Sequence, residues 1–255
     1  MEPTQYNMKN ICVLFLFFFS LVSIGQIKTS YAVVDAKMNA ISGNSTSSIN
    51  TIARYINANF KTDKDKIRAA FYWTASNISY DVANMFTVDL EETDHGKIAK
   101  TLKTKKGVCS HYASVFNTLV REIGIESYII SGYTKQMGKV DNLAHAWTAA
   151  KIDGSWYIFD PTWGAGYVDN GKFYKKLNNT YFKVQPAQII ASHIPFDYLW
   201  QFLNYPISNG EFYEGKTQVS KSQKYFDFEK EISKYNASSE IDSCLRQQQE
   251  LKKTV

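Results

Sequence analysis

The sequence predicts an α+β fold in which a helix that begins at a cysteine packs on an antiparallel sheet. Apolar residues recur every three or four positions over residues 108–123, as on one face of an α-helix. Gly124 follows where a left-handed helix cap is expected. Downstream, residues 144–152 and 155–160 are rich in apolar and aromatic side chains and have the length of strands.

The dipeptide Asp153-Gly154 between these two strands is typical of a two-residue hairpin turn. Counting outward from the turn, Ile152 lies opposite Ser155. This register brings His145 and Asp160 to one end of the hairpin, on the same face of the sheet. The two side chains are therefore expected to be within hydrogen-bonding reach of each other.

The remaining elements are predicted from periodicity, caps and turn residues along the chain. In order, we expect helices near 48–59 and 63–77, a short helix around 96–101, the helix that begins near Cys109, strands near 126–134, 144–152, 155–160 and 181–184, a helix after Pro186, and a charged helix over 226–252.

The composition is that of a globular protein with one substantial core. Of 255 residues, 44% are hydrophobic and 21% are charged, and the formal net charge is +5. No stripe of Lys and Arg and no aromatic RNA-binding motif occurs, which argues against a nucleic-acid partner. Lys103, Lys105 and Lys106 precede the cysteine and are interpreted as a solvated loop, with attraction of acidic substrates as the alternative.

The N-terminus has the pattern of an export signal. Lys9 precedes an almost unbroken apolar run from Ile11 to Ile24, and Gly25 provides a small residue for cleavage before Gln26. The run is shorter than the roughly 20 residues that a membrane span requires. We therefore expect an extracytoplasmic protein, periplasmic or secreted, without a membrane span after cleavage, and an uncleaved anchor is the alternative.

Cys109, His145 and Asp160 have the residue types and order of a nucleophilic thiol site. At the first turn of a helix, free backbone N–H groups and the helix dipole favour the thiolate form of Cys109. An imidazole such as His145 stabilises a thiolate and protonates a leaving group, and a carboxylate such as Asp160 fixes the imidazole tautomer. The alternatives are a cysteine buried only for packing and a His–Asp hydrogen bond without chemistry.

Three blocks of the sequence resemble the transglutaminase-like superfamily, which has a papain-like cysteine-protease core. They are G-V-C-S-H-Y-A around Cys109, A-H-A-W around His145, and D-G-S-W-Y-I-F-D-P-T-W-G around Asp160. An upstream block, A-A-F-Y-W-T-A-S-N-I-S-Y-D, is similar to the helix that precedes the cysteine in that family. A looser likeness to a subgroup with a tail after the core extends through residues 192–201.

The resemblance implies a papain-like transglutaminase core with Cys109 as nucleophile, His145 as base and Asp160 as orienting residue, in an exported, bacterial-type member. On this basis we divide the chain into a signal peptide (1–25), an N-terminal segment (26–60), a catalytic core (61–185) and a C-terminal helical extension (186–255). The expected function is thiol acyl transfer on amide bonds of a protein or peptide substrate, as a peptidase, an amidase or a transglutaminase. A protein- or glycan-binding module that has kept the fold without catalysis is the alternative.

Other candidate residues are assigned structural roles. His111 is expected to point away from the thiol, and His193 to fix the C-terminal segment to the core, with a His193–Asp197 pair as an alternative. No metal site is expected from Cys109, His111, His145 and Asp160, because their spacing is not that of metal ligands, and no cofactor is expected.

Two further expectations concern tryptophan and cysteine side chains. Trp147, Trp156 and Trp163 are expected to wall the cleft or the core. A Cys109–Cys244 disulfide is the alternative to a free nucleophile in an oxidising compartment.

Overall fold

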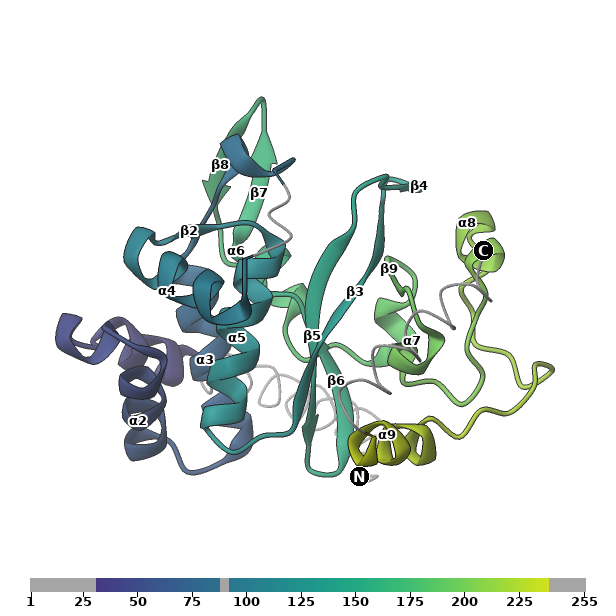
Figure 1. Ribbon diagram of the computed structural model, residues 1–255, viewed down its shortest axis with the longest axis horizontal. Coiled ribbons are helices and arrows are strands. Elements are labelled where there is room, and N and C mark those ends of the chain that lie inside the picture. The colour runs from purple at the N-terminus through teal and green to yellow at the C-terminus, as the bar shows by residue number, and fades with distance from the viewer. Residues whose placement is uncertain (1–30, 88–91, 239–255) are drawn as a thin grey trace, which may run out of the picture.

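A computed structural model describes residues 31–87 and 92–238 of the chain. Figure 1 shows an α+β arrangement, with a curved antiparallel sheet between an N-terminal group of helices and a C-terminal group of short elements. The N-terminal group follows a helical stretch at residues 31–39 and comprises η1 (Gly43–Thr46), α2 (Ile49–Asn59), α3 (Asp63–Asn77), η2 (Val82–Asn84), α4 (Asp94–Thr104) and α5 (Cys109–Glu122).

The central sheet has five strands in which every neighbouring pair is antiparallel. Its order is β4-β3-β5-β6, and β9 pairs with β3 as well. The strands are β3 (Ser127–Gln136), β4 (Lys139–Val140), β5 (His145–Ile152), β6 (Ser155–Phe159) and β9 (His193–Pro195).

The hairpin between β5 and β6 confirms the predicted turn and register. Asp153 and Gly154 have φ angles of 51° and 77°, as a turn with two left-handed residues requires. Ile152 pairs with Ser155, and the ladder continues to Thr148 opposite Phe159. His145 and Asp160 lie just beyond that end of the ladder, so local turn chemistry sets their relative position.

Helix α5 carries the apolar face that the sequence predicts. Its side chains that face the sheet and α3 are fully buried, among them Tyr112, Val115, Phe116, Leu119 and Val120. Gly124 ends the helix with a φ of 90°, a conformation that costs glycine little. Burial of this face holds the helix, and with it Cys109 at its first position, against β5.

The chain approaches Cys109 through a short parallel pair of strands. β1 (Ser79–Tyr80) pairs with β2 (Lys106–Gly107), so that Tyr80 lies opposite Gly107. A hairpin of β7 (Gly166–Asp169) and β8 (Lys172–Lys175) follows α6 (Pro161–Ala165) and rises above the helices in Figure 1.

Helices α2 and α3 confirm the predictions for residues 48–59 and 63–77, and Ser48 and Thr62 are their N-caps. The helix predicted at 96–101 is longer, because Thr93 caps α4 at its N-terminus and the helix runs from Asp94 to Thr104.

The strand predicted at residues 181–184 is wrong. Asn178 accepts a hydrogen bond from the Thr180 backbone and starts a 3₁₀ turn, η3 (Asn179–Tyr181). Lys183 then has a φ of 56°, which breaks an extended run, and only Val184 forms an isolated bridge, to Ile158.

The segment after residue 186 contains a strand of the central sheet as well as helices. It contains α7 (Pro186–Ile189), β9, η4 (Tyr198–Gln201), α8 (Asn209–Glu214) and α9 (Phe228–Ala237), of which β9 belongs to the central sheet. The helix predicted over 226–252 is present as α9, and its remainder from residue 239 lies outside the described residues. The domain limits stay a prediction, and the signal peptide at 1–25 also lies outside the described residues.

Within the described residues, none of the helices has the length and apolar character needed to span a bilayer.

Gly132 sits where β3 passes between β5 and β9. It pairs with His145 on one side and Pro195 on the other. A Cβ atom at this position would collide with the carbonyl oxygen of Ile194 and approach the Trp147 ring to 2.7 Å. Only glycine allows β9 to lie this close, so Gly132 controls the placement of the residues that β9 carries.

We therefore predict that Gly132→Ala destabilises the protein by about 1–3 kcal/mol, the usual cost of overpacking. Gly43→Ala is the matched control, because a Cβ atom there would have no atom of the described residues within 4 Å. Urea unfolding of both variants measures the difference. A Gly132→Ala protein as stable as the Gly43→Ala protein contradicts this account of the β3–β9 contact.

Candidate active site

Cys109 is the first residue of α5, directly after the β1–β2 pair. Its position at the helix start is the predicted one, and its thiol is free and partly exposed. The Val108 backbone donates to His111 Nδ1 at 3.3 Å, which stabilises the first turn of the helix. His111 Nε2 lies 3.3 Å from Glu92, so the ring serves the packing around the helix start, as expected.

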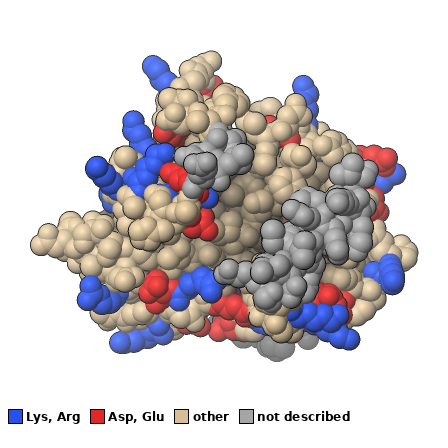
Figure 2. All heavy atoms as spheres, viewed as in Figure 1, with Lys and Arg blue, Asp and Glu red and all other residues tan. Residues whose placement is uncertain are grey.

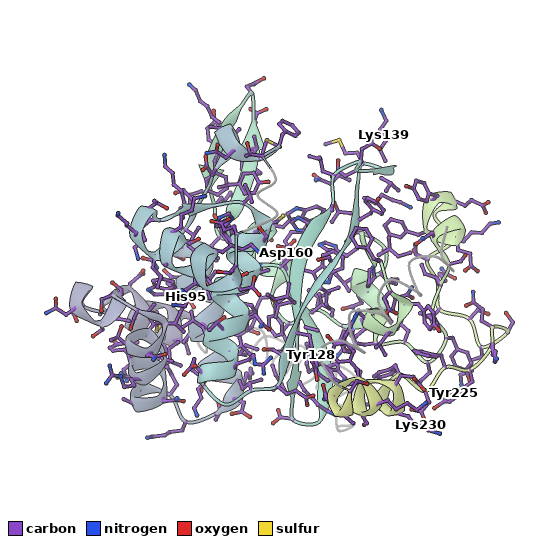
Figure 3. The ribbon with its side chains drawn as sticks, viewed as in Figure 1. His95, Tyr128, Lys139, Asp160, Tyr225 and Lys230 are labelled. Carbon is purple, nitrogen blue, oxygen red and sulfur yellow. The ribbon has the colours of Figure 1, made fainter. Side chains whose placement is uncertain are left out.

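His145 and Asp160 meet as the hairpin register predicts. His145 begins β5, Asp160 follows β6 and is the N-cap of α6, and the His145 Nε2 to Asp160 Oδ2 distance is 2.8 Å. Figure 3 shows Asp160 where the N-terminal helices meet the sheet. Cys109 lies close enough to interact with the His145 imidazole, and each of the two groups shifts the pKa of the other. The structure thus places the predicted His145–Asp160 pair beside Cys109.

The Asp160 carboxylate is buried and saturated with donors. Its Oδ1 atom accepts the backbone N–H groups of Thr162 and Trp163, at 2.9 and 3.0 Å. Burial by itself raises the pKa of Asp160, but the charge and hydrogen bond of His145, followed by the hydrogen bond of His193, bring it far below its usual range. Asp160 is therefore an anion at neutral pH.

The same charges set the protonation of the other two residues. Burial lowers the pKa of His145, but Asp160 and then Cys109 outweigh it and raise it to about 10. Burial raises the pKa of Cys109, but the hydrogen bond and charge of His145, together with the Ala146 backbone N–H, lower it overall. Both shifts favour a thiolate facing an imidazolium.

Sequence reasoning missed two residues at this site, His193 and Tyr80. His193 Nε2 lies 3.2 Å from Asp160 Oδ2, so His193 contacts the site carboxylate. As expected, His193 connects the C-terminal segment to the core, because it belongs to β9, which pairs with β3. Asp197, the alternative partner considered for His193, caps η4 by accepting a hydrogen bond from the Leu199 backbone N–H. The only signal in the sequence was a histidine among apolar residues, which does not identify a partner.

Tyr80 faces the site from β1. Burial raises the pKa of its phenol to about 12, and the charges of Cys109 and Asp160 add to this shift. The phenol therefore remains a neutral hydrogen-bond donor near the thiolate. Its place follows from the pairing of Tyr80 with Gly107, a tertiary contact that no local pattern announced.

Two of the three predicted tryptophans flank the imidazole. The rings of Trp147 and Trp163 lie 6.1 and 5.6 Å from His145, between centroids. Trp156 instead packs 4.7 Å from Phe202, in the same core cluster as Trp147 but at the other end of the hairpin. Aromatic walls around His145 exclude water and strengthen its interactions with the charged groups.

His145, Asp160 and His193 form the cluster of possible metal-ligand atoms among the described residues, with those atoms within 4.8 Å of one another. Both imidazole Nε2 atoms are directed at a single carboxylate oxygen, at 2.8 and 3.2 Å. Both distances are within the range of a hydrogen bond. We therefore describe the cluster as a hydrogen-bonded network.

The face of the molecule in Figure 2 is hollowed near its centre, and Lys and Arg side chains gather over the α4 side. Lys97, Lys100 and Lys103 are on α4, and Lys105 and Lys106 follow it. Lys100 pairs with Glu92 at 3.3 Å, so part of this charge is compensated locally.

Comparison with known families agrees with this geometry. Residues 50–161 match the model of the transglutaminase-like superfamily. This part of the chain is similar to that superfamily. The match spans α2 to the start of α6 and includes Cys109, His145 and Asp160. It ends before β9, so His193 lies outside the matched region.

Among curated proteins, the human kyphoscoliosis peptidase is 33% identical over 159 residues, which are 59% of this chain and 24% of that protein. The Drosophila melanogaster protein hillarin is 27% identical over 172 residues, 59% of this chain and 20% of hillarin. The chain thus spans about a quarter or less of the length of these relatives.

Solved structures with a related fold include a TGase, which is 16% identical, covers 66% of this chain and 43% of its own, and has a TM-score of 0.38. The periplasmic domain of TgpA from Pseudomonas aeruginosa is 20% identical, covers 45% of this chain and 42% of its own, and has a TM-score of 0.36.

The lowered pKa of Cys109 predicts fast alkylation by iodoacetamide at pH 6, where an ordinary thiol with a pKa of about 8.5 is mostly protonated. In His145→Ala the hydrogen bond and the charge that lower the pKa of Cys109 are lost. Burial, which raises this pKa, remains. The rate at pH 6 should then fall at least about tenfold, since one pKa unit is a tenfold change in thiolate, and recover as the pH rises.

Peptide mapping by mass spectrometry follows Cys109 separately from the other two cysteines. Alkylation in guanidinium chloride is the control for intrinsic thiol reactivity. Equal rates for the wild type and His145→Ala at pH 6 contradict the thiolate–imidazolium pair.

Proposed function

We propose that this protein is a thiol acyl-transfer enzyme that acts on amide bonds of proteins or peptides. The observation that carries the proposal is the hydrogen bond between His145 and Asp160, at 2.8 Å, beside a Cys109 thiol whose pKa His145 lowers. The similarity of residues 50–161 to the transglutaminase-like superfamily supports it, because cysteine peptidases and transglutaminases belong to that superfamily.

In the proposed reaction, the Cys109 thiolate attacks the amide carbonyl carbon and the carbonyl π electrons move to oxygen. The tetrahedral intermediate collapses as the C–N bond breaks, and His145 gives its Nδ1 proton to the departing amine. A thioester on Cys109 remains. Water or a second amine then attacks the thioester, His145 accepts the proton of the attacking group, and Cys109 is released as a thiolate.

Stabilisation of the oxyanion requires donors near the thiol. We propose the Cys109 backbone N–H, which is at the first position of α5, and the phenol of Tyr80. Because the pKa of the phenol is about 12, Tyr80 keeps its proton over the working pH range.

Hydrolysis is the outcome we favour for the second step. The described residues around Cys109 form no recognisable acceptor site for a lysine-like amine, whereas the thiol is partly exposed to solvent. The product is then a carboxylic acid, and the enzyme is a peptidase or amidase.

Variants of the three residues test the proposed roles. Cys109→Ala should abolish turnover, and His145→Ala should be nearly as severe, because general acid–base catalysis alone contributes about 10²–10⁴. Asp160→Asn should lower the rate by up to about 10⁴, since its amide donates where His145 needs an acceptor and favours the wrong tautomer. Combined substitutions should add little. The measurement is a rate series on protein and peptide amides.

Thermal melts of the same variants separate lost chemistry from lost folding. Cys109→Ala should melt within a few degrees of the wild type, because the side chain is small and partly exposed. Trapping the acyl-enzyme and weighing it by mass spectrometry identifies the acyl group. A substrate processed equally by the wild type and Cys109→Ala overturns the proposal in favour of a binding module.

We also propose that the protein is exported and matures by cleavage before Gln26, on the strength of Lys9 and the apolar run from Ile11 to Ile24. N-terminal sequencing of the protein purified from its native host should give a chain that starts at or near Gln26 in the extracytoplasmic fraction. A cytoplasmic protein that retains Met1 contradicts export.

A further inference from the structure

His193 belongs to the same buried network as Asp160. It is the first residue of β9, it is 1% exposed, and its Nε2 atom lies 3.2 Å from Asp160 Oδ2. The same oxygen accepts His145 Nε2 at 2.8 Å. Two imidazoles therefore share one carboxylate oxygen, and only His145 also reaches Cys109.

The tautomer of His193 follows from its two partners. Its Nδ1 atom lies 2.8 Å from the Ser192 hydroxyl, and its Nε2 atom faces the Asp160 anion. With the proton on Nδ1, an Nε2 lone pair would point at a carboxylate in a buried site, which is repulsive. The favourable arrangement is an Nε2–H that donates to Asp160, with the single Ser192 hydroxyl proton directed to Nδ1 at 2.8 Å rather than to the Ile189 carbonyl oxygen at 3.3 Å.

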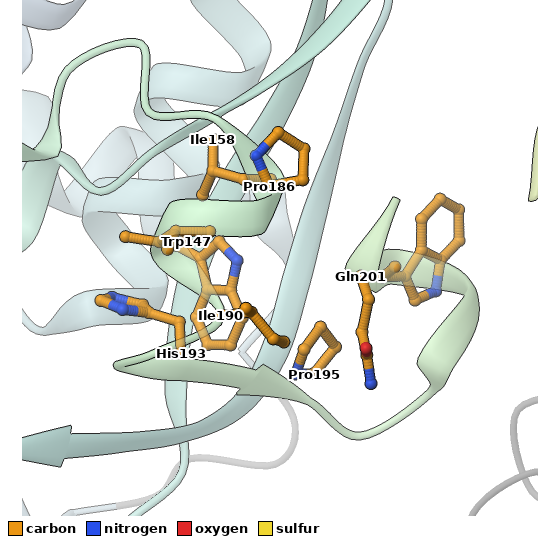
Figure 4. Close-up of a pocket in the computed structure, with 9 residues that line it drawn as sticks. Trp147, Ile158, Pro186, Ile190, His193, Pro195 and Gln201 are labelled. Carbon is orange, nitrogen blue, oxygen red and sulfur yellow. The ribbon is translucent and has the colours of Figure 1, made fainter. Parts of the chain in front are cut away.

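His193 is also neutral, unlike His145. Burial lowers the pKa of His193, Asp160 opposes this, and the positive charge of His145 lowers it further, so the net pKa is below the usual value. The rings of Trp147 and Trp163 lie 5.0 and 4.7 Å away and enclose it. Figure 4 shows His193 at the start of β9 beside Trp147.

We propose that His193 is a positioning residue of the site: as a neutral imidazole it donates its Nε2–H to Asp160 and limits how strongly this carboxylate holds the proton on His145. The inference rests on the proposed function, because it assigns the proton on His145 a task. A hydrogen bond from a neutral donor takes up electron density of Oδ2 and makes the oxygen a weaker acceptor toward His145.

The consequence for chemistry is a proton that His145 releases more readily. Asp160 stabilises the imidazolium, which favours the Cys109 thiolate, but excessive stabilisation would hinder proton donation to the leaving amine. His193 moderates this interaction without adding charge. The site then extends beyond the region that matches the family model, to a residue held in place by the β3–β9 pair and Gly132.

Other titratable groups lie close to His145 and Asp160. Cys109 from α5 faces His145, and its thiolate adds to the imidazolium's stability. Tyr80 from β1, Tyr112 from α5 and Tyr181 from η3 respond to the charge of Asp160, and each phenol is held neutral by burial. A Cys109→Ala background removes the thiol that faces His145.

The test is a titration of ¹⁵N-labelled histidine by NMR in Cys109→Ala protein. The chain has four histidines, so each imidazole is assigned by its own substitution. We expect His193 to appear as a neutral Nε2–H tautomer at pH 7 and above. We expect the pKa of His145 to rise by about one unit in His193→Leu, because a donor to the charged carboxylate is lost. His193→Gln, whose amide N–H replaces Nε2–H, should restore the original value.

Gln201→Met is the matched control. Gln201 is a buried side chain of the same segment, and it makes two hydrogen bonds with the Ile207 backbone, at 2.8 and 2.9 Å. This variant should lose stability and leave the pKa of His145 unchanged. An equal shift in Gln201→Met and His193→Leu, or no shift in His193→Leu, reduces His193 to a packing residue and overturns the inference.

Substitution of the other three histidines assigns the His193 signals by elimination. The tautomer measurement therefore needs no change at His193 and decides the matter even if His193→Leu does not fold. A protonated or Nδ1–H His193 at pH 7 overturns the inference. The titration needs no substrate, so its result is independent of turnover. A shift without any amide-cleaving activity contradicts the proposed function and leaves the coupling of His193 to His145 standing.

Discussion

The buried charge of Asp160 is the interaction on which the site depends. A carboxylate without water is costly unless donors surround it, and here two backbone N–H groups and two imidazoles supply them. The backbone donors come from the first turn of α6, so the N-terminus of this helix stabilises the anion. Once the anion is fixed, it determines the tautomer and charge of His145, and His145 in turn determines the ionisation of Cys109.

The residues of this network come from three separate elements of the structure. The start of α5 brings Cys109, the β5–β6 hairpin brings His145 and Asp160, and β9 brings His193. The apolar face of α5 and the sheet form the core that fixes the start of α5 and the β5–β6 hairpin. The position of β9 depends on its close passage over Gly132, where no side chain fits. The position of His193 in the site therefore depends on one tight contact.

The two histidines on Asp160 illustrate how environment separates identical side chains. Both are buried, and burial lowers the pKa of each. His145 gains the charge of Asp160 at 2.8 Å and that of Cys109, which reverses the effect, whereas His193 sits farther from the carboxylate and faces a neutral hydroxyl. One ring becomes a cation that can transfer a proton, and the other becomes a fixed donor.

The sequence by itself determined the helix that starts at Cys109, the Asp153-Gly154 hairpin and the proximity of His145 to Asp160, because helical periodicity, caps and turn residues act over a few positions. Only the tertiary structure decided that His193 joins Asp160, 33 residues away along the chain, and that Tyr80 faces the thiol. These contacts arise from strand pairs between distant segments, β9 with β3 and β1 with β2, whose formation depends on the burial of whole surfaces. The same limit explains the wrong strand at 181–184, where a side-chain turn at Asn178 and a left-handed Lys183 overrode an aromatic, strand-like pattern.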